Sequence, residues 1–373
     1  MENIKVGVLG ATGAVGQKFI ALLQHHPYFR VHELVASERS AGKPYRDAVS
    51  WVQSSALPDS AAETRVKSTE EPLESAILFS GLDSSIAGEL ERHYAEAGHV
   101  VISNSKNHRM EPDVPLVIPE INADHLAMIE HQPYPGALVT NPNCSTIFLA
   151  MALAPLHRAF GVEAVQVSTM QAISGAGYPG LSATDIMGNV IPHISGEEEK
   201  LETETLKILG TRNADRVLPA EIAIGAQCNR VAVIDGHTET LSVKLASRPQ
   251  LAEVRAALED FRGYPQVAAL PSAPQQALWV FDDPNRPQPA RDLMIEGGMA
   301  TLIGRLRTCP VFDVRMVVLG HNTIRGAAGA AILNAEALVA MGYFSGGCFS
   351  KAPHSRDACV EVGAQGEPVT GGV

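Results

Sequence analysis

The sequence predicts an α/β domain of the Rossmann type, followed by an α+β domain with a mixed, largely antiparallel sheet. Three observations lead to this prediction. Strand-like and helix-like stretches alternate through the first 140 or so residues, as in parallel sheets. A glycine-rich turn separates the first strand from the first helix. Strands follow one another with few helices between them in the second half, and 373 residues are enough for two domains.

The composition is that of a globular protein, with 45% hydrophobic and 19% charged residues. A formal net charge of −12 argues against nucleic acid or an anionic membrane as the main partner. No signal peptide is visible, because Glu2 and Lys5 lead directly into a strand. The most apolar stretch, Gly326–Phe344, is interrupted by Asn334 and Glu336 and is expected to be a buried helix.

The cysteines argue against a disulfide framework and against a zinc site. They are odd in number and widely spaced, and no pair forms a CxxC motif, at Cys144, Cys228, Cys309, Cys348 and Cys359. The thirteen histidines show no metal-ligand spacing, so no metal is expected. A reducing, cytoplasmic location is the natural setting for such a chain.

The first strand and the turn after it predict a phosphate-binding site. Ile4–Leu9 is a short apolar strand, and a helix-like stretch runs from the turn to Pro27. The glycine spacing is GxxGxxG, because Thr12 stands where the second glycine of the common pattern would be. Backbone N–H groups at such a turn and helix start favour an anion. The expected cofactor contacts in this turn are Gly10, Thr12, Gly13, Ala14 and Val15.

The second strand, Val31–Ala36, ends in a segment that indicates which dinucleotide is bound. An acid at this point usually serves the ribose 2′-hydroxyl of NAD, whereas arginine accommodates the 2′-phosphate of NADP. Ser37, Arg39 and Ser40 favour NADP. Glu38 leaves open some use of NAD, or it faces solvent.

The remainder of the first domain supplies further strand ends. Ser54–Pro72 is expected to be a surface excursion, followed by strands at Ala76–Phe79 and Val100–Ile102 and a helix over Ser85–Ala97. Ligands of parallel sheets bind at the carboxyl ends of the strands. The polar residues near such ends are Ser80, Asn104, Lys106 and Asn141, of which Ser80 is an expected cofactor contact. Lys106–Arg109 is either a receptor for an anionic substrate or an exposed polar loop.

Cys144 stands where a strand gives way to a helix. Pro142 ends the strand, Asn143 is a good N-cap, and no helix breaker follows before Pro155. A thiol in the first helical turn has a lowered pKa, because the helix dipole favours the thiolate. The alternative is an ordinary core thiol.

The second domain carries strands, a flexible turn and two helices. Val162–Ile173 alternates as a strand and leads into Ser174–Gly180, a turn suited to wrapping a ligand, in which Gly175 is an expected cofactor contact. Glu197–Leu209 is an amphipathic helix whose acidic face is expected to be solvated. Another helix is expected from Pro249 to about Arg262, and strands at Leu302–Leu306 and Val311–Leu319.

Cys228–Leu245 holds two further candidates for function. The Asp235-Gly236 turn would redirect the chain at His237, and Arg230 lies on the preceding strand. A dinucleotide fold with a reactive thiol suits the oxidation of an aldehyde through a thioester. His237 would then take the proton from sulfur, and Arg230 would clamp a carboxylate. The alternatives are a structural histidine and a surface ion pair.

Seven motifs, in this order, resemble those of the aspartate-semialdehyde dehydrogenases of archaea, fungi and some bacteria. The resemblance extends to about Tyr343, and the motifs are GATGAVGQ at 10–17, ASERS at 36–40, SNSKNHR at 103–109, NPNCST at 141–146, QAISGAGYPG at 171–180, CNRVAVIDGHTE at 228–239 and GHNTIRGAAG at 320–329.

The resemblance implies reversible conversion of aspartate semialdehyde, phosphate and NADP to 4-aspartyl phosphate and NADPH, on the route to lysine, threonine and methionine. By the resemblance, Cys144 is the nucleophile, His237 the acid/base catalyst and Gln171 the residue that orients the substrate. Substrate and phosphate contacts are implied for Arg230, Arg109, Asn143, Glu197 and Lys200, and cofactor contacts for Thr12, Gly13, Ser37, Arg39 and Asn322.

The resemblance also implies a homodimer or homotetramer. We expect an NADP-binding domain over 1–143, to which a C-terminal helix over 322–344 returns, a catalytic and dimerisation domain over 144–321, and a loose tail over 345–373. Other activities remain open, namely a paralogous acyl reductase, such as malonyl-CoA reductase or an acylglutamyl-phosphate reductase, and a cofactor-binding protein without catalysis.

Overall fold

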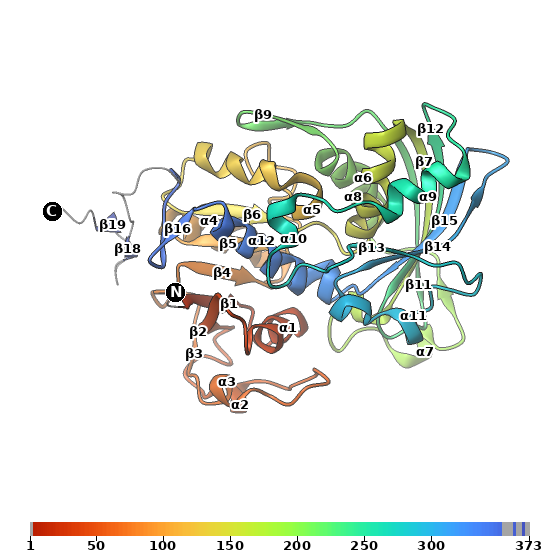
Figure 1. Ribbon diagram of the computed structural model, residues 1–373. Helices are drawn as coiled ribbons and strands as arrows, with labels where there is room; N and C mark the ends of the chain where they lie inside the picture. The colour runs from red at the N-terminus through yellow and green to blue at the C-terminus, as the bar shows by residue number, and fades with distance from the viewer. Residues whose placement is uncertain (1–2, 353–360, 363–367, 370–373) are drawn as a thin grey trace.

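The computed structural model, which describes residues 3–352, 361–362 and 368–369, is built on two large sheets that lie beside each other (Figure 1). The first has six parallel strands in the order β3-β2-β1-β4-β5-β6. Its strands are β1 (Ile4–Leu9), β2 (Phe29–Val35), β3 (Val66–Lys67), β4 (Ile77–Ser80), β5 (Val100–Ser103) and β6 (Ala137–Thr140). The predicted Rossmann-type sheet is confirmed.

Helices α1 (Ala14–Leu23), α4 (Ser84–Glu96) and α12 (Gly329–Ala340) pack around this sheet. The Asp83 side chain caps α4 by accepting from the backbone N–H of Ser85 at 2.9 Å. α12 is buried along most of its length and contacts α1, β4 and β5. Helix α12 therefore returns the chain to the first sheet. Its polar residues Asn334 and Glu336 are buried.

The expected surface excursion at Ser54–Pro72 does lie mostly at the surface, but it is not irregular throughout. The segment contains a short helix, α3 (Asp59–Ala62), and the edge strand β3, in which Val66 pairs with Leu34. A strand of two residues cannot show alternation in the sequence, so only its partner strand reveals it.

The second sheet has seven strands in the order β13-β14-β15-β12-β7-β11-β8. Four of its six pairings are antiparallel and two, β7 with β11 and β13 with β14, are parallel, as predicted for a mixed sheet. The strands are β7 (Val162–Gln171), β8 (Val190–Ile191), β11 (Ala223–Val231), β12 (His237–Leu245), β13 (Leu278–Val280), β14 (Thr301–Thr308) and β15 (Val314–Gly320).

One face of the second sheet is covered by helices α6 (Thr146–Phe160), α8 (Glu197–Ile208) and α9 (Leu251–Glu259). Figure 1 shows α6 and α8 on the side of the sheet that is turned toward the first sheet. Residues on the other face remain half-buried or exposed within this chain, among them Gln166, Met170, Thr240, Lys244 and Val317.

The loops at the carboxyl edge of the first sheet are tied to neighbouring strands. The backbone N–H of Ala11 donates to Val35, that of Gly81 to Leu9, and that of Asn141 to Ser103, at 2.8–2.9 Å. The turn after β1 and the segment after β6 are thus held at one edge. They are three strands apart, or roughly 14 Å.

The expectation of a loose tail from residue 345 is wrong as far as Ala352. β16 (Phe344–Ser345) and β17 (Cys348–Phe349) form a hairpin, with the rings of Phe344 and Phe349 5.5 Å apart. Lys351 Nζ donates to the carbonyl of Gln132 at 2.7 Å. β18 (Glu361–Val362) pairs with β19 (Pro368–Val369), and the rest of the expected tail lies outside the described residues.

Candidate active site

Cys144 lies between β6 and α6, in a turn that Asn143 stabilises. The Asn143 side-chain oxygen accepts from the backbone N–H groups of Ser145 and Thr146, at 2.9 and 3.2 Å. The Asn143 carbonyl accepts from Ile147, as in a helix. The predicted cap is therefore present, although the regular helix begins only at Thr146 and continues through Pro155 to Phe160.

Cys144 and His237 form a close pair. The Cys144 sulfur lies 3.2 Å from Nε2 of His237, which is fully buried as the first residue of β12. Gly236 precedes it with a φ of +100°, so the predicted turn does redirect the chain at this point. The backbone N–H of Ala172 donates to Nδ1 of the same ring at 3.0 Å.

Burial decides the protonation of this pair. It raises the pKa of the Cys144 thiol to about 12, and the neighbouring carboxylate of Glu197 adds to the rise. Burial, together with Arg230, lowers the pKa of His237 to about 3. These shifts oppose the predicted lowering of the thiol pKa, because loss of solvation and the Glu197 carboxylate outweigh Arg109, Arg230 and Lys200. Both shifts favour the neutral thiol and the neutral imidazole over the ion pair.

Arg230 and Gln171 lie beside this pair, because β11 and β7 place them opposite each other in register. Arg230 Nη1 donates to the carbonyl of Ala172 at 2.7 Å. The turn that holds Gly175 passes directly over them. A Cβ atom at Gly175 would lie 2.8 Å from Arg230 Nη1 and 3.1 Å from His237 Nε2, so a larger residue there would displace the Arg230 guanidinium.

Glu197 joins several of the predicted residues. Its carboxylate accepts from Asn143 Nδ2 at 2.9 and 3.1 Å, from Gln171 Nε2 at 3.0 Å, and from Lys200. Burial alone would raise the pKa of Glu197, but Lys200 and the two amides lower it below its ordinary value. The expectation of a solvated acidic face on this helix is thus wrong at Glu197.

Arg109 is buried at the same site. Its Nη1 donates to Glu204 Oε1 at 2.9 Å and its Nη2 to the carbonyl of Asn104 at 2.7 Å. Its Nε is buried and has no hydrogen-bond partner within the part of the chain that the structure describes. This N–H is therefore an unsatisfied buried donor.

The turn between β1 and α1 has the geometry of a phosphate cradle. Gly10 has a φ of +71°, and a Cβ atom there would lie 2.7 Å from the carbonyl oxygen of Gly81. Gly13 stands at the N-cap of α1, where no side chain caps the helix. The first N–H groups of α1 are therefore left to another acceptor. The predicted contacts Thr12, Ala14 and Val15 belong to this turn and the first residues of α1.

The segment after β2 is a tight turn in which Ser40 N–H donates to the carbonyl of Ser37 at 2.8 Å. Ser37, Glu38 and Arg39 are exposed, and Lys43 Nζ donates to the Arg39 carbonyl at 2.7 Å. Both Arg39 and Glu38 are thus accessible to a ligand at the carboxyl end of β2.

The predicted cofactor residues Ser80 and Asn322 differ in what their side chains bind. Ser80 is fully buried and donates to Glu91 Oε1 at 2.5 Å, so its hydroxyl is not presented to a ligand. Contact of Ser80 with the cofactor stays a prediction. Asn322 donates to Ser174 Oγ at 2.8 Å and accepts from the backbone N–H of Gly236 at 2.8 Å. It therefore holds the turn of Gly175 and the turn before His237 together.

Sequence reasoning missed several buried charged residues around the site: Glu91, Glu204, Lys207 and Glu239. A signal for two of them was present. Glu197, Lys200, Glu204 and Lys207 recur at helical spacing on one face of α8, the face that also carries the buried Leu201. Charged residues that share a helix face with a buried leucine are as consistent with a face turned into the protein as with one turned toward solvent.

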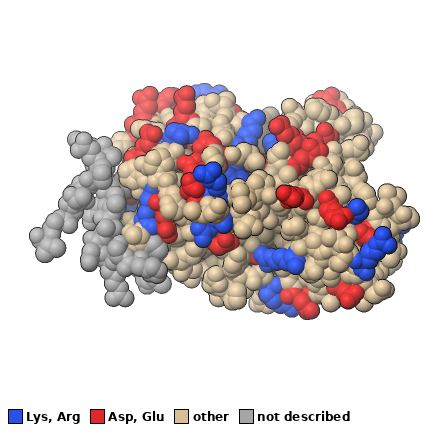
Figure 2. Space-filling view, turned by 90° about the horizontal axis from the view of Figure 1, so that it is seen from above, with Lys and Arg blue, Asp and Glu red and all other residues tan. Residues whose placement is uncertain are grey.

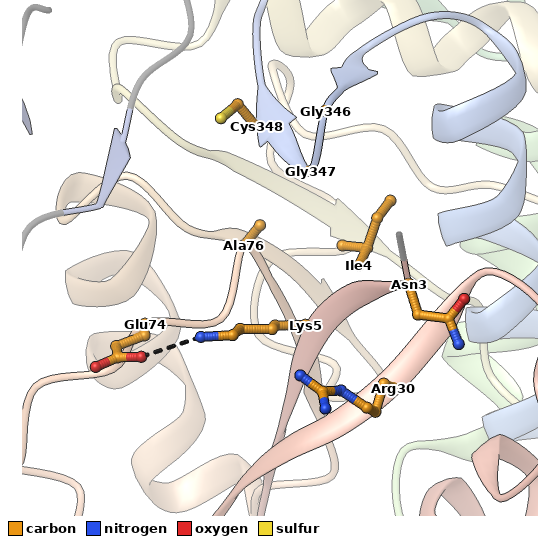
Figure 3. Close-up of a pocket in the computed structure, with 9 residues that line it drawn as sticks. All are labelled: Asn3, Ile4, Lys5, Arg30, Glu74, Ala76, Gly346, Gly347 and Cys348. Atoms are coloured by element: carbon orange, nitrogen blue, oxygen red, sulfur yellow. Dashed lines mark hydrogen bonds and ion pairs between the residues drawn. The ribbon is translucent and has the colours of Figure 1, made fainter. Parts of the chain in front are cut away.

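A second hollow lies away from this site. A pocket of about 510 Å³ lies at the opposite end of the first sheet, where Lys5 pairs with Glu74 at 3.3 Å (Figure 3). It lies at the amino ends of the strands, away from the edge at which parallel sheets bind ligands. Among the described residues, no group of three or more His, Cys, Asp or Glu side chains could hold a metal ion.

Two further surface properties concern possible partners. Acidic and basic side chains are interspersed on the face seen in Figure 2, without a continuous basic stripe. Within the described ranges, no helix combines the length and the apolar character that a membrane crossing requires.

Comparisons with known proteins give one family for both halves of the chain. The model of a semialdehyde dehydrogenase NAD binding domain matches residues 5–129, and that of a semialdehyde dehydrogenase dimerisation domain matches residues 153–325. The aspartate-semialdehyde dehydrogenase of Methanothermobacter thermautotrophicus is 48% identical over 341 residues, which cover 89% of this chain and 98% of the relative. That of Schizosaccharomyces pombe is 49% identical over 352 residues, covering 91% and 98%.

A solved structure gives the same result. The crystal structure of aspartate semialdehyde dehydrogenase with NADP from Candida albicans aligns with a TM-score of 0.84 and 45% sequence identity. The alignment covers 91% of this chain and 99% of that one.

Proposed function

The chain belongs to the aspartate-semialdehyde dehydrogenase family, and we propose that it converts L-aspartate 4-semialdehyde, phosphate and NADP reversibly to 4-phospho-L-aspartate and NADPH. The proposal places the enzyme in the biosynthesis of lysine, threonine and methionine, in the cytoplasm. The observation that carries it is the 3.2 Å pair of Cys144 and His237, set between a dinucleotide-type turn and two buried arginines.

NADP fits the carboxyl edge of the first sheet. The uncapped start of α1 and the close approach of Gly10 to Gly81 would receive the pyrophosphate. Arg39 and Ser37 are exposed where the adenosine 2′-phosphate would lie. Asn322 and Gly175 stand near the catalytic pair, where the nicotinamide end would reach. When bound, NADP supplies the acceptor for the hydride that leaves the substrate carbon.

Arg230 is proposed to bind the substrate carboxylate. One of its N–H groups is fixed on the Ala172 carbonyl, so the guanidinium is oriented before the substrate arrives. Glu197, which accepts from Asn143 beside Cys144, is proposed to bind the substrate ammonium group with its negative charge. Gln171 donates to Glu197 and thereby links the two halves of the substrate site.

The proposed chemistry is covalent and uses Cys144 as the nucleophile. Its sulfur bonds to the aldehyde carbon while the thiol proton passes to the aldehyde oxygen, which gives a thiohemiacetal. Loss of a hydride from that carbon, together with release of the hydroxyl proton to solvent, leaves a thioester on Cys144. His237 faces the sulfur through Nε2, from where it would stabilise the sulfur anion and the oxyanion on the substrate carbon by hydrogen bonding.

Phosphate completes the reaction by attacking the thioester carbon, which breaks the carbon–sulfur bond and forms 4-phospho-L-aspartate. Arg109, with a buried N–H that has no partner among the described residues, is proposed to hold this phosphate together with Lys200 and Asn143. Two arginines at one cysteine suit a substrate with a carboxylate plus a separate phosphate. This pairing favours the proposed reaction over reduction of malonyl-CoA.

The dimerisation-domain match supports an oligomer, and we propose a homodimer or homotetramer. The helix-free face of the seven-stranded sheet would supply the interface, since Met170 and Val317 are only half-buried there. We also propose the division into an NADP-binding domain over 1–143 and a catalytic domain over 144–321. The packing of α12 against α1 supports the return of the last helix to the first domain.

A single-turnover experiment tests the proposal. Mixing the protein with L-aspartate 4-semialdehyde and NADP without phosphate should give a burst of about one NADPH per site and an acyl group on Cys144. Cys144→Ser should give no burst while binding NADP as tightly as the unaltered protein. A burst of the same size in Cys144→Ser would overturn the covalent route.

A further inference from the structure

Glu204, which lies on α8 and is 2% exposed, joins two parts of the site that come from different segments of the chain. Its Oε1 accepts from Arg109 Nη1 at 2.9 Å. Its Oε2 accepts from the backbone N–H of Asn143, next to Cys144, at 2.7 Å. Both carboxylate oxygens are therefore engaged, one by the anion site and one by the nucleophile loop.

We propose that Glu204 is a positioning residue that couples Arg109 to the loop of Cys144. It would hold the Arg109 guanidinium at a fixed place relative to the Cys144 thioester. The inference deepens the proposed function, because it assumes that Arg109 receives the phosphate. Attack by phosphate requires its oxygen and the thioester carbon to meet in one geometry. The Glu204 carboxylate, which binds both Arg109 and the Asn143 backbone, would set that geometry without touching the phosphate or the thioester.

Helix α8 is firmly anchored to both sides of the site. Lys207, one turn after Glu204, donates all three ammonium protons to the carbonyls of Arg109, Glu111 and Val114, at 2.7–2.8 Å. It therefore fixes the loop that carries Arg109. On another face of α8, Glu198 and Glu202 accept from the backbone N–H groups of Cys228 and Ala226 in β11, at 3.0 Å.

The orientation of Arg109 also follows from this arrangement. Glu204 and the Asn104 carbonyl hold its two terminal nitrogens, so the guanidinium cannot rotate freely. The buried Nε–H remains without a partner among the described residues. Glu204 thus fixes the orientation of the Arg109 guanidinium.

Glu204→Gln tests the proposal, because a glutamine can accept from only one of the two donors and must turn its own N–H₂ toward the other. Glu202→Gln on the same helix is the matched control, since Glu202 accepts from the Ala226 backbone N–H and forms no hydrogen bond to Arg109 or Asn143 among the described residues. For both variants we would measure the NADPH burst without phosphate, the phosphate dependence of steady-state turnover, and the melting temperature.

We expect Glu204→Gln to slow the attack of phosphate on the thioester and to leave formation of the thioester, which the NADPH burst reports, nearly unchanged. In Glu204→Gln the KM for phosphate should rise and turnover at limiting phosphate should fall by about tenfold to a hundredfold. The burst amplitude and the dissociation constant of NADP should stay within about twofold, as should all parameters of Glu202→Gln. An unchanged phosphate dependence, or an equal loss in both half-reactions with a lowered melting temperature, would overturn the proposal.

A second experiment does not depend on turnover. It measures how far inorganic phosphate slows the alkylation of Cys144 by iodoacetamide. If the unaltered protein gives no burst, the proposed function fails, and weaker protection in Glu204→Gln would still support the positioning role. Equal protection in both proteins would contradict that role. Should Glu204→Gln not fold, Glu204→Asp keeps the charge with a shorter reach, and the same selective loss in the phosphate step is expected at smaller size.

Discussion

The backbone N–H of Ala172 donates a 3.0 Å hydrogen bond to Nδ1 of His237, whose other ring nitrogen faces the Cys144 sulfur. A neutral imidazole that accepts at Nδ1 carries its proton on Nε2. His237 is thereby set to donate toward sulfur. Uptake of the thiol proton at Nε2, as the sequence analysis predicts, would first require the Ala172 hydrogen bond to break.

The first prediction is therefore the tautomer itself. Nitrogen-15 NMR of labelled protein at pH 7 should show His237 protonated at Nε2, with no imidazolium down to about pH 5, because burial lowers the pKa of this ring to about 3. A ring protonated at Nδ1, or one that titrates between pH 6 and 7, would contradict the arrangement.

The second prediction concerns the reactivity of Cys144 in the free protein. Burial raises the pKa of the thiol, so the thiolate fraction should increase about tenfold per pH unit across the neutral range. The logarithm of the iodoacetamide alkylation rate should then rise linearly from pH 6 to pH 9. Cys144→Ser identifies the contribution of other thiols. A plateau below pH 8 would show an activated thiolate instead.

The third prediction concerns the choice of dinucleotide. Arg39→Ala should raise the KM for NADP by about tenfold to a hundredfold, because a charge-assisted contact to the 2′-phosphate is lost, and leave the KM for NAD nearly unchanged. Glu38→Gln separates the remaining alternative. If Glu38 binds the ribose hydroxyls of NAD, this variant should weaken NAD alone. Equal losses for both dinucleotides in Arg39→Ala would show that Arg39 does not read the 2′-phosphate.

The fourth prediction concerns Glu239, a fully buried residue whose two carboxylate oxygens have no hydrogen-bond partner among the described residues. Burial raises its pKa well above the ordinary value of 4.5, so the folded protein keeps a proton that the unfolded chain loses. Its contribution to stability is complete below pH 4.5 and declines as the pH rises, by at most about 1.4 kcal/mol per pH unit.

Glu239→Gln removes this titration. Denaturant unfolding should give similar free energies for the variant and the unaltered protein near pH 5, and a more stable variant at pH 8. A difference between the two proteins that does not change with pH would show that Glu239 is not protonated in the folded state.

Much of the fold follows from local sequence. The apolar runs of β1, β4 and β5 and the glycine turn after β1 predict a parallel sheet with its ligand edge, and the alternation in β12 predicts the second sheet. The two-residue strand β3 depends entirely on its pairing with β2, which no local pattern reveals. The hairpin of Phe344 and Phe349 depends on tertiary burial in the same way.

The candidate site divides along similar lines. The positions of Cys144 and His237 follow from a cap and a turn, which are local features. Their pKa values depend on burial by distant segments, which raises that of Cys144 and lowers that of His237. Ser80 is turned away by Glu91, eleven residues further on, and Glu204 acts across 95 residues on Arg109. Charged residues on a helix give little sign of which way they face until the helix is packed.

The most direct test of the central claim is steady-state NADPH formation by the purified protein with L-aspartate 4-semialdehyde, with and without inorganic phosphate. We predict turnover that depends on phosphate and strongly prefers NADP to NAD. No turnover under these conditions, together with NADPH-dependent reduction of malonyl-CoA, would keep the cysteine chemistry and contradict the substrate. Silence in both assays with intact NADP binding would contradict catalysis altogether.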